Sequence, residues 1–354
     1  MKPPVLEAVN LTKHYPVHKG ILNRQIGAVQ AVSDVSFRLM EGETLAIVGE
    51  SGCGKSTLGR ALLRLSEPTA GNVLLDGRDI TTLPTGQLRT TRREMQMVFQ
   101  DPFGSLNPRM TVRETLLEPI ILHGVATGAD ADAMVSELLK TVGLSEFHAG
   151  RYPHEFSGGQ RQRICIARAL ATKPRLIVCD EPVSALDVSV QAQIVNLLQD
   201  LQRQFGLSYV FISHDLAVVR HIADRVAVMY LGRIVEMGDA ETLFHDPRHP
   251  YTRALVAAAP KPMPGAVLPD RAVKGDMPSA LNPPSGCAFH TRCPIARDVC
   301  SRDRPDLRET GGKLVACHFP DEAATIPAPA TAPMSDVLQK RLAVLEQRRR
   351  AALV

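Results

Sequence analysis

The segment Gly49-Glu50-Ser51-Gly52-Cys53-Gly54-Lys55-Ser56 is a complete G-x-x-x-x-G-K-S loop. It follows Thr44 to Val48, a short apolar run that is typical of a fully buried strand. Residues Ser56 to Leu65 come next and carry leucines for the buried face of a helix. Because a strand, a glycine loop and a helix are the context that this motif requires, we predict that the segment binds a nucleoside triphosphate.

The residue types of this loop suit phosphate binding. Its glycines allow backbone N–H groups to approach phosphate oxygens closely, and the helix that begins near Lys55 adds its positive end. We expect Lys55 to reach the terminal phosphates and the Ser56 hydroxyl to bind Mg²⁺. The residues assigned to nucleotide binding here are Gly49, Glu50, Ser51, Gly52, Cys53, Gly54, Lys55, Ser56 and Thr57.

A second phosphate-binding segment, Ser157-Gly158-Gly159-Gln160, lies too far along the chain to serve the same nucleotide. This separation suggests that the second segment faces outward, toward a partner. The apolar run Leu176 to Cys179 follows it and ends in Asp180 and Glu181. An Asp at the end of a strand can hold Mg²⁺ through water, and a neighbouring Glu can orient or deprotonate an attacking water.

Two further polar residues are candidates for the same site. His214 ends the strand-like run Tyr209 to Ser213, and at the end of a parallel strand it would face the phosphates. Gln100, in Val98-Phe99-Gln100-Asp101-Pro102, has an amide that can ligate a metal ion or bind water. Judged by its chemistry alone, Gln100 is a weaker candidate than His214.

Length and composition limit the number of domains, the class of partner and the location that the chain can have. The chain has 354 residues, 44% of them apolar, which is enough for one large domain or two smaller ones. Its net charge of +4 is too small to indicate a nucleic-acid partner. No stretch approaches the roughly 20 apolar residues of a membrane span, and Met1 to Pro4 does not begin a signal peptide. A cytoplasmic location is therefore expected.

Further elements can be placed from patterning. Alternation at Val35, Phe37 and Leu39 predicts a half-buried strand, and residues 111 to 145 read as a helical insert. We also predict a helix over Gln160 to Ala171 and a hairpin around Leu231-Gly232. Prolines crowd residues 260 to 284.

The end of the chain differs in composition from the rest. Asp321 to Met334 is rich in Ala and Pro and is predicted to be a linker. A final helix capped by Ser335 would place leucines against Arg348 to Arg350. This helix could dock on a partner, but we favour a solvated tail.

These segments, in this order, resemble the ATP-binding cassette of ABC transporters over roughly residues 5 to 262. The resemblance makes Gly49 to Ser56 the Walker A loop and Leu176 to Asp180 the Walker B strand, with Cys179 as a mild departure. Phe156 stands where leucine is commoner. The other roles it implies are Tyr15 for adenine stacking, Gln100 for the Q-loop, Ser157 to Gln160 for the signature motif, Glu181 for the catalytic glutamate, Ser184 to Asp187 for the D-loop and His214 for the switch histidine.

The resemblance implies an α/β fold, a P-loop NTPase cassette over residues 1–262. It has a RecA-like core, an antiparallel β part and a helical subdomain of about residues 101–165. A small cysteine-containing C-terminal domain over 263–320 and a tail over 321–354 would follow. In this family two cassettes dimerise head to tail, and each ATP lies between one subunit's Walker A loop and the other's signature motif. Asp187 would also reach this interface, and Gln100, Ser56 and Asp180 would hold Mg²⁺.

Narrower features point to one branch of the family. Asp101 to Arg109, Arg248 to Thr252 and Asn282 to Cys287 resemble segments of the ATPase subunits of oligopeptide, dipeptide and nickel importers, and the likeness extends to about residue 320. It is strongest to the F-type subunit of dipeptide permeases. The implied partners are a second ATPase in a heterodimer, two membrane permeases and an extracytoplasmic peptide-binding protein. Residues around Phe103 to Met110 would help to receive the permease.

This branch places the chain peripherally on the cytoplasmic face of the inner membrane. Import of nickel or another small solute is the alternative within the family. A soluble cassette ATPase acting on ribosomes or DNA is the alternative outside transport, but this chain has one cassette and no long coiled-coil insertion. An iron–sulfur electron carrier would leave the ATP machinery unexplained.

The seven cysteines form two groups. Cys53, Cys165 and Cys179 are scattered and expected to behave as small apolar residues. The second group clusters near the C-terminus, and in a reducing compartment it suggests a metal site before it suggests disulfides. Its members are Cys287, Cys293, Cys300 and Cys317.

Four thiolates suit either Zn²⁺ or a 4Fe–4S cluster. The spacings lack the C-x2-C pairs of a zinc ribbon, and related peptide-importer ATPases carry a cluster in this region, so the family resemblance favours iron–sulfur in a structural role. Bound zinc and no bound metal remain open, and His290 and His318 are alternative ligands.

Overall fold

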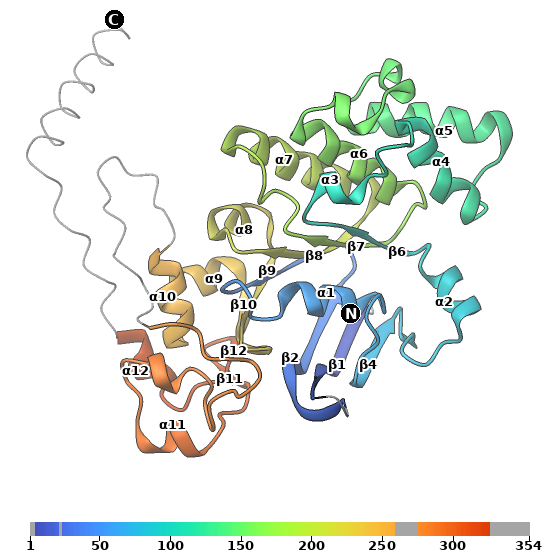
Figure 1. Cartoon of the computed structure of the whole chain (residues 1–354). Helices are drawn as coiled ribbons and strands as arrows, with labels where there is room; N and C mark the ends of the chain where they lie inside the picture. The colour runs from blue at the N-terminus through green and yellow to red at the C-terminus, as the bar shows by residue number, and fades with distance from the viewer. Residues whose placement is uncertain (1–3, 21–22, 259–274, 326–354) are drawn as a thin grey trace, which may run out of the picture.

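The computed structural model describes residues 4–20, 23–258 and 275–325, and its centre is a mixed eight-stranded sheet (Figure 1). Five strands run parallel, and three antiparallel strands extend one edge. In spatial order the strands are β11 (Arg308–Thr310), β12 (Lys313–Val315), β10 (Arg233–Asp239), β9 (Arg225–Tyr230), β3 (Thr44–Val48), β8 (Ser208–Ser213), β7 (Leu176–Asp180) and β6 (Met95–Val98).

A second, antiparallel sheet lies beside the first (Figure 1). Its order is β2 (Arg24–Met40), β1 (Pro4–Lys19), β4 (Ala70–Leu75) and β5 (Arg78–Asp79). The predicted alternation in β2 is confirmed, because Val35, Phe37 and Leu39 are buried while their neighbours are exposed. Together with helix α1 (Lys55–Leu62), this sheet encloses one of the two hydrophobic cores.

The helical insert predicted for residues 111 to 145 is confirmed by α4 and α5, which sit in the upper part of Figure 1 near α6. Besides α1, the described helices are α2 (Thr85–Thr91), α3 (Pro102–Ser105), α4 (Val112–Leu122), α5 (Gly128–Thr141), α6 (Gly158–Leu170), α7 (Val188–Phe205), α8 (Leu216–Ile222), α9 (Ala240–His245), α10 (Pro250–Ala258), α11 (Asp298–Arg302) and α12 (Pro320–Thr325). Short 3₁₀ turns are η1 (Glu146–Gly150), η2 (Pro153–Glu155) and η3 (His290–Arg292).

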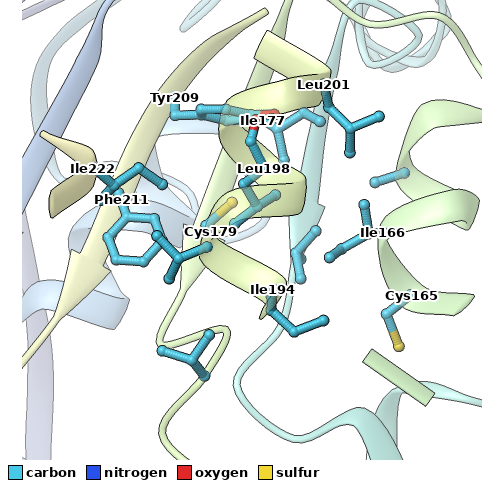
Figure 2. Packing of buried hydrophobic residues seen from close by; sticks show 14 of the residues in the cluster. Cys165, Ile166, Ile177, Cys179, Ile194, Leu198, Leu201, Tyr209, Phe211 and Ile222 are labelled. Carbon is cyan, nitrogen blue, oxygen red and sulfur yellow. Dashed lines mark hydrogen bonds between the residues drawn. The ribbon is translucent and has the colours of Figure 1, made fainter. Parts of the chain in front are cut away.

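The larger core lies between the parallel strands and helices α6 and α7. Figure 2 shows Cys179 and Phe211 of the strands gathered near Ile194 and Leu198 of α7. Cys53, Cys165 and Cys179 are all buried, and burial raises the pKa of the Cys165 thiol to about 11. These three cysteines therefore stay protonated and pack as small apolar residues, as predicted.

Two predicted boundaries were wrong. Helix α1 ends at Leu62 rather than Leu65, because Arg64 turns left-handed at φ 49° and its guanidinium donates to the Ile80 and Leu83 carbonyl oxygens. The linker was predicted to begin at Asp321, but Asp321 to Thr325 belong to helix α12. The tail helix predicted after Ser335 falls outside the described residues. Within the three described ranges, no helix combines the length and apolarity needed to cross a bilayer.

Two strands of residues 275–325, β11 and β12, join the main sheet. Strand β12 pairs antiparallel with β10, with Glu236 opposite Val315 and Met237 opposite Leu314. The Ala316 N–H also donates to the Val235 carbonyl oxygen at 2.8 Å. We call residues 275–325 the C-terminal unit, and this pairing connects it to the same sheet that carries the glycine loop.

Candidate active site

The glycine loop links the buried end of β3 to the start of α1, and its backbone lies directly against two neighbouring strands. A Cβ at Gly54, whose φ is 107°, would lie 1.9 Å from the Ala31 carbonyl oxygen. A Cβ at Gly49 would lie 2.2 Å from the Met229 carbonyl oxygen. Only glycine fits at these positions, which explains why the motif could be recognised from the sequence.

Lys55 is buried inside this loop. Its ammonium donates to the carbonyl oxygens of Gly49 at 2.8 Å and Glu50 at 3.0 Å. Helix α1 has no acidic residue in its first turn, so nothing in that turn cancels its positive end. The loop, the ammonium and the helix terminus together form an anion-binding site of the kind that receives phosphates.

Ser56 and Asp180 meet beside the loop, as the predicted magnesium site requires. The Ser56 hydroxyl donates to Asp180 Oδ1 at 2.8 Å, and Asp180 ends the buried strand β7. Burial raises the pKa of Asp180, while the hydrogen bond from Ser56 and the charge of Arg60 act in the other direction. A hydroxyl and a carboxylate in contact are oxygen ligands that suit Mg²⁺.

Glu181 is the centre of a polar group formed at the carboxyl ends of three parallel strands. Its Oε2 accepts a hydrogen bond from Gln100 Nε2 at 2.9 Å and lies 3.2 Å from His214 Nδ1. The Glu181 backbone is left-handed, with φ 46°, and its N–H donates to the Ile212 carbonyl oxygen at 3.0 Å. The structure thus brings together three residues that the sequence analysis selected separately, and it fixes one carboxylate oxygen beside the phosphate-binding loop.

Two family profiles match the chain: "ABC transporter" over residues 32–184, and "Oligopeptide/dipeptide transporter, C-terminal region" over residues 235–300. The oligopeptide transport ATP-binding protein AppF of Bacillus subtilis is 54% identical over 89% of this chain and 97% of its own length. The di/tripeptide transport ATP-binding protein DppF of Pseudomonas aeruginosa is 50% identical over 90% and 98%. The chain belongs to the ATP-binding subunits of the oligopeptide and dipeptide ABC transporters.

A solved structure supports the same assignment. The dimeric, ADP- and phosphate-bound post-hydrolysis state of the ATP-binding cassette MJ0796 is 32% identical, with a TM-score of 0.59, and covers 66% of this chain and 98% of that one. The predicted cassette fold is therefore confirmed, and the chain is an ABC ATPase.

The segment predicted to be the ABC signature motif forms the N-terminus of α6. The Ser157 hydroxyl accepts a hydrogen bond from the Gln160 N–H at 3.4 Å, and the Gln160 side chain accepts one from the Ser157 N–H at 3.1 Å. A Cβ at Gly159 would lie 2.5 Å from the Val190 side chain, so glycine allows α6 to pack closely against α7. Ser157 is exposed. In the part of the chain that the structure describes, no hydrogen bond or ion pair links this segment to the Walker A loop.

Two predicted nucleotide contacts of this ABC ATPase lie on its surface. Tyr15, on β1, is 39% exposed, with Lys13 Nζ 4.8 Å from its ring centre and its hydroxyl 3.3 Å from Ser66 Oγ. Asp187 is exposed at the N-cap of α7, next to Val188, which is 81% exposed.

The four C-terminal cysteines line one small pocket with apolar walls that include Phe289 and Phe319. Burial raises the pKa of Cys293 to about 11 and of Cys317 to about 12, and neighbouring thiolates add to both shifts. Across the described ranges, however, no three His, Cys, Asp or Glu side chains are arranged to hold a single metal ion. The four cysteines therefore line one pocket, but among the described residues they form no metal-binding group, and this arrangement supports neither the predicted iron–sulfur cluster nor zinc.

Three contacts to the Walker A loop were missed by sequence reasoning. Tyr251 Oη accepts the Glu50 N–H at 2.8 Å, the Gly232 N–H donates to the Cys53 carbonyl oxygen at 2.8 Å, and Arg292 pairs with the Glu50 side chain. Tyr251 and Gly232 belong to segments that the sequence analysis selected for other reasons. Arg292 carries no local signal, because its partner lies in a distant part of the chain.

Proposed function

We propose that this chain hydrolyses ATP to drive peptide import, acting as one half of a pair of ATP-binding subunits. The position of Glu181 supports the proposal of ATP hydrolysis. Its Oε2 contacts Gln100 and His214, next to the Ser56–Asp180 pair. A carboxylate fixed by two neighbours at a phosphate site can accept the proton of an attacking water.

The residues divide the chemistry as follows. Backbone N–H groups of Gly49 to Ser56 and the Lys55 ammonium hold the triphosphate. Ser56, Asp180 and Gln100 would hold Mg²⁺, which would neutralise charge on the phosphates. Glu181 orients the water and accepts its proton, and Gln100 and His214 keep the carboxylate in place. The Tyr15 ring stacks on adenine.

Substitution of Glu181 and Lys55 separates hydrolysis from binding. Glu181→Gln keeps both hydrogen-bonding neighbours but removes the base, so it should bind ATP like the wild type and lower turnover about a hundredfold. Lys55→Ala should instead weaken ATP binding about tenfold. Equilibrium binding and steady-state hydrolysis, measured on the assembled complex, test both. Wild-type turnover by Glu181→Gln would remove Glu181 from its assigned role.

The signature segment supports a shared site. Ser157, Gly158, Gly159 and Gln160 present a hydroxyl and the N-terminus of α6 at the surface, and the cassette MJ0796 is dimeric in its ADP- and phosphate-bound structure. We infer that this segment and Asp187 complete the ATP site of a neighbouring subunit, as the family pattern implies. The neighbour is proposed to be a second, different ABC ATPase, which gives a heterodimer.

The cargo and the membrane partners are inferred from the relatives. AppF and DppF are named for oligopeptide and di/tripeptide transport, and the C-terminal match is to the same class. The chain would work with two permeases and an extracytoplasmic binding protein at the cytoplasmic face of the inner membrane. Phe103, which is 65% exposed and stacks 3.6 Å from the Arg161 guanidinium, lies in the segment proposed to receive a permease helix.

Uptake measured for the whole complex decides between cargoes. Competition by dipeptides or longer peptides, without competition by nickel, supports the peptide assignment. Nickel uptake that peptides do not reduce supports the alternative.

We further propose that Cys287, Cys293, Cys300 and Cys317 hold a 4Fe–4S cluster. The four thiols line one small pocket, and four is the number of thiolate ligands that such a cluster takes. Burial, with a smaller contribution from neighbouring thiolates, raises the pKa values of Cys287, Cys293 and Cys317, and a positively charged inorganic core would favour their thiolate forms. The cluster would cross-link the C-terminal unit. Anaerobic purification with iron and sulfide analysis tests this, and iron-free protein of full stability would exclude it.

A further inference from the structure

Within the described ranges, a partly buried ion pair links the C-terminal unit to the Walker A loop. Arg292 Nη1 lies 2.8 Å from Glu50 Oε2, and Nη2 lies 3.0 Å from Glu50 Oε1. Only 6% of the Arg292 side chain is exposed, against 27% for Glu50. The two parallel contacts make this a bidentate pair, the geometry that fixes orientation as well as charge.

Glu50 is also held through its backbone. Its N–H donates to Tyr251 Oη at 2.8 Å, and its carbonyl oxygen accepts from Lys55 Nζ at 3.0 Å. The second residue of the loop is thus fixed at its side chain, its N–H and its carbonyl group. A change at Arg292 therefore acts on the same residue that holds the Lys55 ammonium.

An aromatic cluster shared by the cassette and the C-terminal unit holds Arg292 in place. Phe289 is 2% exposed and packs edge-on against Tyr230 at 5.3 Å, with Tyr251 at 5.4 Å. The Arg292 guanidinium lies 5.8 Å from the Tyr230 ring centre and 3.4 Å from the Tyr230 hydroxyl. This support limits the positions that the guanidinium can take, so the pair with Glu50 is formed before any ligand arrives.

The turn that carries Arg292 lies between two of the pocket cysteines. The His290 N–H donates to the Cys287 carbonyl oxygen at 2.9 Å, the Arg292 N–H donates to the Phe289 carbonyl oxygen at 3.0 Å, and Cys293 follows directly. The fold of the cysteine pocket therefore determines where Arg292 stands.

We propose that Arg292 is a positioning residue for the ATP-binding loop: it fixes Glu50 and neutralises its carboxylate, and through this pair the C-terminal unit sets the affinity for ATP. The proposal rests on the proposed function of Gly49 to Ser56 as the ATP site. An unpaired carboxylate in a loop that receives a triphosphate would repel the ligand. Arg292 itself lies outside the reacting groups and acts only through Glu50.

The test measures binding of a non-hydrolysable ATP analogue to the full-length chain. Arg292→Met leaves the Glu50 charge unpaired and should raise the Kd about tenfold. Adding Glu50→Gln removes that charge, so the double variant should return to within about threefold of the wild type. Arg292→Lys should lie between Arg292→Met and the wild type. Arg308→Met, which breaks an exposed pair in the same unit, is the control and should leave the Kd unchanged.

The possible results distinguish a failure of the Arg292 proposal from a failure of the proposed ATP site. Rescue by Glu50→Gln is the readout that a merely structural role of Arg292 would not produce. An unchanged Kd in Arg292→Met, or a raised Kd that Glu50→Gln does not relieve, overturns the proposal. If Arg292→Met fails to fold, Arg292→Lys alone and combined with Glu50→Gln give the same comparison. A wild-type chain that binds no ATP analogue overturns the proposed ATP site as well.

Discussion

His249 should make the protein sensitive to mild acid, although it takes no part in catalysis. It is 1% exposed, and its Nδ1 accepts the Tyr251 N–H at 3.1 Å, an arrangement that requires the neutral ring. Burial lowers the pKa of His249 from 6.5 to about 3. The folded protein therefore keeps the ring uncharged at pH values where the unfolded chain protonates it.

The sign and size follow from this difference in pKa. Because the folded pKa is depressed, the stability is full above pH 6.5 and is lost progressively as the pH falls from there toward 3. Between pH 7 and pH 5 the unfolded chain takes up most of one proton at this ring, which lowers the free energy of unfolding by about 2 kcal/mol. Glu236 accepts the His249 N–H, and burial raises the pKa of its carboxyl group. Because Glu236 is present in both the wild type and the His249 variant, its titration cancels when the two are compared.

The perturbation is His249→Asn, whose amide oxygen can accept the same Tyr251 N–H without titrating. Urea unfolding at both pH values gives the change in free energy of unfolding for each protein. The wild type should lose about 2 kcal/mol more than the variant over this interval. His245→Gln, at an exposed histidine, is the matched control and should behave like the wild type. Equal losses in the wild type and His249→Asn would show that His249 is not the source of the acid sensitivity.

Two further substitutions test the loop and the signature motif. Gly54→Ala should lower the free energy of unfolding by about 2 kcal/mol or more, since its Cβ would meet the Ala31 carbonyl oxygen at 1.9 Å, whereas Gly52→Ala, also at positive φ but in open space, should cost about 1 kcal/mol. Thermal or urea unfolding distinguishes them, and equal costs would contradict the steric argument. Ser157→Ala should lower ATP turnover of the assembled complex roughly tenfold while the isolated chain binds ATP as before. A loss of ATP binding by the isolated chain would place Ser157 in its own site instead.

Much of the active site was predictable because its signals are local. Gly49 and Gly54 belong to one continuous motif, even though the carbonyl oxygens that exclude a Cβ there belong to Met229 and Ala31, and Asp180 and His214 stand where buried strands end. Parallel strands bring such ends to one edge of the sheet, so the contact of Ser56 with Asp180 and the grouping around Glu181 followed from order along the chain.

The rest depended on partners distant in sequence. Nothing near Val315 indicates that β12 will pair with β10, and nothing near Arg292 indicates Glu50. The end of α1 was missed for the same reason, since Arg64 is held by the carbonyl groups of Ile80 and Leu83. Side chains that bind across the fold leave no periodic pattern or motif for sequence reasoning to detect.

Coupling of ATP hydrolysis at Glu181 to peptide uptake is the step on which the proposed function depends. Its most direct test is uptake of a labelled peptide by vesicles that contain the complete complex, with either the wild-type chain or Glu181→Gln. We expect uptake that requires ATP on the side of this chain and that falls at least tenfold in Glu181→Gln. Uptake at the wild-type rate in Glu181→Gln, or uptake without ATP, would contradict it.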